Sequence, residues 1–150
     1  MRYFDPKALL FAPHGQHIVL VHFPIALLIT SVAFDLLARW MGRRALASAA
    51  AFNLYAAALT APIAAGTGLI AWRWQLEGAR LKGALLLHLC SAMVVVLLCW
   101  GMAWFRLRRP RGSDTPLPVA YHTTGVMTCL VIAATAHLGG IVSGVVTLGG

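Results

Sequence analysis

Histidines are the residues of this chain best suited to chemistry, and three of them stand close together near its start. His14, His17 and His22 fall in the stretch HGQHIVLVH, at residues 14–22, where a long apolar run begins. A neutral imidazole binds iron, copper and zinc, and an ionisable side chain at membrane depth is costly and usually functional. Which of the histidines can act together depends on the elements that carry them.

The composition identifies lipid as the main surroundings of those elements. Of the 150 residues, 60% are hydrophobic and only 11% are charged, too few to cover a globular domain of this size. The net charge of +8 comes from short basic clusters between apolar runs, which is typical of membrane loops. We therefore expect membrane lipid, and no nucleic acid, as a partner.

Four apolar segments are each long enough to cross about 30 Å of hydrocarbon as a helix. The expected spans are residues 17–40, 45–72, 83–105 and 119–147. Short connections favour antiparallel neighbours, so residues 1–150 are predicted to form one all-α domain, an integral-membrane four-helix up-down-up-down bundle. Seven basic residues follow the first and third spans and five lie on the other side, which predicts that both termini are outside.

This topology brings histidines from three helices to the outer side. His17 and His22 open the first span, His88 lies early in the third, and His137 lies late in the fourth. His122 falls near the inner surface instead. His17 and His22 should diverge by about 140° around a regular helix, so only one of them can face the bundle. We expect this to be His22, the deeper residue, with His17 joining only if the helix begins after it.

Convergent imidazoles of this kind suit a haem, which four-helix bundles commonly hold through histidines on facing helices. The chain has no C-x-x-C-H motif, so a haem would be bound non-covalently, as haem b. Gly66 and Gly140 would leave room beside the ring, although close helix packing also explains such residues. Arg73 and Arg80 in the outer loop could bind the propionates.

A bare metal site is the alternative. Zinc and copper sites are often completed by a carboxylate or thiolate ligand. Copper bound by histidines alone remains the second metal candidate. Asp35 is not expected to be such a ligand, because it should pair with Arg39 one helical turn away. No hydrolase motif and no pair of carboxylates accompanies the histidines, so we expect no enzymatic activity beyond a role as an oxidoreductase subunit.

Three sequence blocks carry a resemblance to a known family. VHFPIALL at 21–28, FDLL at 34–37 and AHLGG at 136–140 resemble the bacterial predicted membrane proteins catalogued as domain of unknown function 2231. The resemblance implies a four-helix membrane protein whose histidine positions correspond to His17, His22, His88 and His137. Where the family usually has His-Pro, this chain has His17 followed by Ile18, and a family tyrosine after AHLGG is missing. The family supplies no function.

Two functions follow as hypotheses. The first is a b-type haem electron-transfer protein of the bacterial inner membrane, with periplasmic termini. Its ligand candidates are His22, His88 and His137, then His17, and its redox partner would be a cytochrome or a larger respiratory complex. The second is a non-catalytic accessory or scaffold subunit, whose histidines make structural hydrogen bonds or hold copper or zinc.

Overall fold

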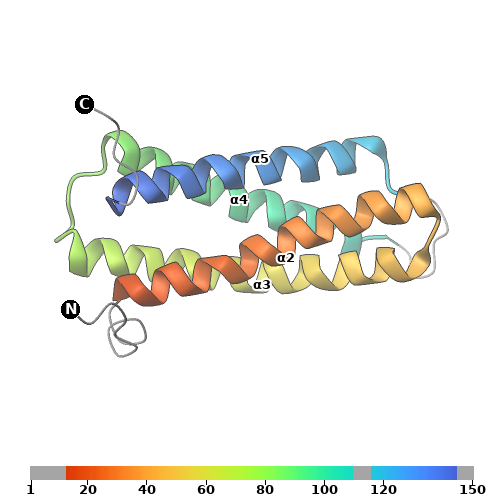
Figure 1. Ribbon diagram of the computed structural model, residues 1–150, viewed down its shortest axis with the longest axis horizontal. Helices are drawn as coiled ribbons and strands as arrows, with labels where there is room; N and C mark the ends of the chain where they lie inside the picture. The colour runs from red at the N-terminus through yellow and green to blue at the C-terminus, as the bar shows by residue number, and fades with distance from the viewer. Residues whose placement is uncertain (1–12, 110–115, 145–150) are drawn as a thin grey trace, which may run out of the picture.

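A computed structural model describes residues 13–109 and 116–144 and places them in four helices (Figure 1). The helices are α2, Pro13–Met41; α3, Arg44–Gln75; α4, Gly83–Leu107; and α5, Val119–Val142. The described residues contain no strand. The predicted all-α four-helix architecture is confirmed. Arg2, Lys7, Arg111, Asp114 and the side chain of His14 lie outside the described part.

The first helix begins earlier than the sequence predicts. α2 starts at Pro13, so His17 and His22 both lie on one continuous helix. Pro24 is therefore well inside α2, as Pro62 is inside α3. Helices in a membrane tolerate internal proline because neighbouring helices and hydroxyl side chains compensate the freed backbone carbonyls.

The four helices form two antiparallel hairpins. α2 packs most extensively on α3 and α4 on α5, whereas α3 meets α4, and α2 meets α5, less closely (Figure 1). Gly42, at φ +63°, supplies the left-handed residue that reverses the chain between α2 and α3. Only 17% to 28% of the most apolar stretch of each helix is buried inside the protein. The remaining apolar surface needs lipid, and all four helices are long and apolar enough to span a membrane.

Most of the packed core lies in one half of the bundle. We call the half in which α2 and α4 begin and α3 and α5 end the terminal half, and the other the distal half. With each helix divided at its midpoint, the terminal half comprises residues 13–27, 60–75, 83–95 and 131–144. Among the described residues, four in the terminal half are buried: Ala61, Ala64, Ala71 and Ile132. The core cluster around Leu28, Leu54 and Cys99 lies in the distal half.

Candidate functional site

His17 faces the neighbouring helix of its own hairpin. Its Nδ1 lies 3.2 Å from the carbonyl oxygen of Ala64 and 3.1 Å from Oγ1 of Thr67, both on α3. The Thr67 hydroxyl donates to the same Ala64 carbonyl, at 2.7 Å. A Cβ added at Gly68 would lie 2.9 Å from Cε1 of His17. The imidazole is thus tethered through Nδ1 and lies directly against a glycine.

His88 is held in the same way in the second hairpin. Its Nδ1 lies 2.9 Å from the carbonyl oxygen of Thr135 on α5. A Cβ added at Gly139 would lie 3.1 Å from Cε1 of His88. Both histidines are half-buried, and both belong to the terminal half of the bundle.

The hydrogen bonds determine the tautomer of both imidazoles. A backbone carbonyl only accepts, so Nδ1 of His17 and of His88 must carry the proton and donate it. In a neutral imidazole the lone pair then belongs to Nε2. Metal-binding histidines commonly have this arrangement, with one ring nitrogen on the metal and the other donating to a carbonyl or carboxylate.

The structure reverses the expected orientation of the two histidines of α2. His22 is exposed, and its Nδ1 bonds the carbonyl oxygen of Ile18 on its own helix. The prediction that His22 faces the bundle is wrong, because α2 is regular from Pro13 and the register that buries Leu28 turns His17 inward. His137 is exposed on α5 as well, so it does not join His88 in the interior.

The other predicted cofactor contacts lie in the terminal half but are only loosely enclosed. Arg73, in the last turn of α3, and Arg80, in the connection to α4, are both exposed. Gly66 and Gly140 are half-buried, and a Cβ added at Gly66 would have no described atom outside its own helix backbone within 4 Å. Within residues 13–109 and 116–144, no three histidine, cysteine or acidic side chains come close enough to hold a metal ion together.

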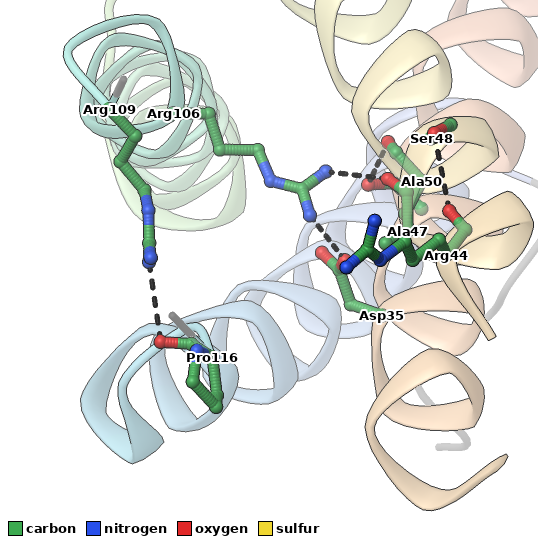
Figure 2. A network of polar contacts seen from close by, with 9 residues as sticks. Asp35, Arg44, Ala47, Ser48, Ala50, Arg106, Arg109 and Pro116 are labelled. Carbon is green, nitrogen blue, oxygen red and sulfur yellow. Dashed lines mark hydrogen bonds and ion pairs between the residues drawn. The ribbon is translucent and has the colours of Figure 1, made fainter. Parts of the chain in front are cut away.

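A second polar site joins the hairpins in the distal half (Figure 2). Arg106 of α4 donates to Asp35 of α2 at 2.5 Å, with side-chain exposures of only 7% and 3%. The same guanidinium reaches the carbonyl oxygen of Ala47 on α3, at 3.5 Å. The predicted pair of Asp35 with Arg39 is therefore corrected: Arg39 is exposed, whereas Asp35 turns into the bundle toward Arg106.

Tyr121 of α5 lies next to this ion pair, and His122 packs against Tyr121. The Arg106 guanidinium lies 5.6 Å from the ring centroid of Tyr121, and the His122 ring lies edge-on to Tyr121 at 5.9 Å. His122 is buried, although it lies in the first turn of α5. Oδ2 of Asp35 and the hydroxyl of Tyr121 have no hydrogen-bond partner among the described residues. Each such orphaned polar atom costs about 1–3 kcal/mol.

Sequence reasoning missed this distal site because it looked for charge partners within one helix. The available signal was the apolar register of α2: Leu28, Val32 and Asp35 follow one another at spacings of four and three residues. Such spacing places all three on the same helix face. An acid on a buried face requires a cation from another helix.

Comparison with known proteins identifies the family. A family model described as predicted membrane protein (DUF2231) matches residues 13–149. The chain therefore belongs to this family, as the histidine-containing sequence blocks had suggested. No curated protein and no solved structure matches the chain.

Proposed function

We propose that this member of the DUF2231 family is a b-type haem electron-transfer protein of the bacterial inner membrane, and that His17 and His88 supply its iron ligands. One observation carries the proposal. Two imidazoles on different hairpins are tethered alike, each through Nδ1 to a backbone carbonyl, in the half of the bundle where few of the described side chains are buried. In this proposal His17 and His88 are the ligands. His22, which is deeper but exposed, and His137, which is also exposed, are no longer ligand candidates.

The tautomers support this pairing. With Nδ1 protonated, His17 and His88 each have their lone pair on Nε2, the form in which imidazole binds iron. The carbonyls of Ala64 and Thr135 fix the ring orientation, which lowers the entropic cost of binding a metal. The two ligands come from two hairpins, so a haem would also hold the hairpins together.

The packing of the terminal half supports a bulky apolar ligand. Of the four described side chains that are buried there, three are alanines (Ala61, Ala64 and Ala71) and one is Ile132. Gly68 and Gly139 allow both imidazoles to lie close against a helix, and a Cβ added at Gly66 would have no described atom outside its own helix backbone within 4 Å. A porphyrin would supply the apolar contacts that the side chains of this half do not make.

The predicted activity follows from the ligand number. Two histidine ligands leave iron no open position, which favours electron transfer over oxygen chemistry. Exposed Arg73 and Arg80 would pair with the propionates at the periplasmic face. The redox partner would be a cytochrome or a larger respiratory complex that presents its own cofactor on that side of the membrane.

Absorption spectroscopy tests the proposal. The full-length protein, purified in mild detergent from cells supplied with haem precursor, should give a dithionite-reduced minus oxidised spectrum with the sharp bands of a six-coordinate b-type haem. Its pyridine haemochrome should identify haem b. A flat difference spectrum, with no haemochrome, would contradict the proposal.

A second candidate function is supported by the same hydrogen bonds. His17 and His88 each link the two helices of one hairpin. These bonds would serve a purely structural role in a non-catalytic accessory subunit, or in one that holds copper or zinc on the two Nε2 atoms. Such a subunit would bind no haem.

Asparagine substitutions separate the two functions. In His17→Asn and His88→Asn the side-chain amide can still donate to the α3 or α5 carbonyl, but no Nε2 lone pair remains. The haem proposal expects both variants to fold and to lose haem. The scaffold alternative expects asparagine to restore the stability that His17→Ala and His88→Ala lose, in a protein without haem.

A further inference from the structure

The two hairpins repeat one another at a constant distance along the chain. The bonds of His17 to Ala64 and of His88 to Thr135 both span 47 residues. Asp35 and Arg106 are 71 residues apart, and His17 and His88 have the same separation. Gly68, beside His17, and Gly139, beside His88, are separated by the same number of residues.

The buried faces of the helices follow this offset as well. Seven residues buried in the first hairpin have a buried counterpart at the equivalent position of the second. These pairs are Leu28 and Cys99, Ser31 and Met102, Val32 and Ala103, Ala50 and Tyr121, Leu54 and Gly125, Ala57 and Thr128, and Ala61 and Ile132.

Turn geometry does not explain this agreement. α2 and α3 are separated by Gly42 and Arg43 alone, whereas α4 ends at Leu107 and α5 begins only at Val119. The number of residues between equivalent positions is nevertheless the same in both hairpins. Duplication of a two-helix unit, followed by divergence of side chains and turn, accounts for a shared register with different turns.

The relation between the units is a rotation about the long axis of the bundle. α2 and α4 both begin in the terminal half, so the repeats are parallel and not inverted (Figure 1). In such an arrangement, a contact between two equivalent residues must lie across the rotation axis. Asp35 and Arg106 are equivalent and in contact, so they mark this axis in the distal half.

We infer that the chain is a duplicated two-helix unit, and that Asp35 and Arg106 determine which units pair with each other. Two first hairpins from different chains would bring two Asp35 carboxylates together, and two second hairpins would bring two Arg106 guanidinium groups together. Buried like charges are strongly unfavourable, whereas the flanking Leu28 and Cys99 are apolar and discriminate little. Each hairpin therefore pairs with the equivalent surface of a hairpin that carries the opposite charge. That hairpin belongs to the same chain or to a second copy.

Complementation between charge-reversal variants tests this inference on the full-length protein. Asp35→Arg gives a chain with arginine at both positions 35 and 106, and Arg106→Asp gives a chain with aspartate at both. Alone, each variant should lose thermal stability and yield of monomer. Coexpressed with different affinity tags, they should form a heterodimer in which hairpins are exchanged and both ion pairs are restored, with a melting temperature close to that of the wild type.

Two controls complete the test. Two differently tagged wild-type chains should stay separate, because the linked hairpin has a high effective concentration. The double variant Asp35→Arg/Arg106→Asp should be monomeric and regain the stability that the single variants lose. Absence of a heterodimer from the coexpressed variants, equal exchange between wild-type chains, or a double variant as unstable as the single ones would each overturn the inference.

Discussion

The terminal and distal halves of the bundle use polar side chains in opposite ways. In the terminal half, His17 and His88 bond within their own hairpins, to α3 and α5 respectively. In the distal half, which contains most of the buried apolar core, Arg106 and Asp35 bond between hairpins. The distal half therefore holds the two hairpins together, whereas the histidine bonds of the terminal half link the helices within each hairpin, and few of the described side chains are buried there.

This difference assigns stability to the distal half and, under the proposed function, ligand binding to the terminal half. Removing one partner of a buried ion pair is costly, because the other charge stays buried without compensation. Tethered imidazoles with Nε2 lone pairs suit a ligand, and a half in which few described side chains are buried can accept one. The distal site should dominate unfolding, and the terminal site should dominate binding.

The largest effect is expected from breaking the distal ion pair. Arg106→Leu leaves the Asp35 carboxylate buried without its cation and should lower the free energy of unfolding by about 3–5 kcal/mol. Unfolding by SDS titration in mixed micelles measures this change. Arg39→Leu is the matched control: Arg39 is exposed on the same helix as Asp35, and its removal should cost less than about 1 kcal/mol. Equal losses in both variants would place the partner of Asp35 on its own helix.

A smaller effect is expected from filling the glycine beside His17. Gly68→Ala forces the imidazole away from α3 and should destabilise the protein by about 1–3 kcal/mol, the usual cost of overpacking. Gly66→Ala adds the same methyl group to the same helix where nothing lies within 4 Å, so it should be neutral or slightly stabilising. The same titration compares them, and indistinguishable variants would show that His17 does not lie against Gly68.

The smallest effect, and one of opposite sign, is expected at Tyr121. Its buried hydroxyl has no hydrogen-bond partner among the described residues, so Tyr121→Phe removes an unsatisfied polar atom while keeping the ring against Phe105. Stability should stay unchanged or rise by up to about 1 kcal/mol. A loss of similar size, measured in the same way, would mean that the hydroxyl has a partner in the distal site.

The sequence predicted the helices well because long apolar runs leave few other structures in a membrane. It placed His17 and His88 in the same half of the bundle, but it chose His22 over His17. The error was one of helix phase: depth along the chain favoured His22, whereas the register of Leu28, Val32 and Asp35 turns His17 inward. Asp35 was misassigned to Arg39 because the cation from α4, 71 residues away, cannot be identified from local spacing.

The haem content of four single variants tests the central claim most directly. His17→Asn, His88→Asn, His22→Asn and His137→Asn would be purified in parallel, and haem b per chain would be measured as the pyridine haemochrome. The account predicts haem loss in the first two variants and wild-type content in the last two. Haem lost from the His22 and His137 variants instead, or from none of the four, would contradict it.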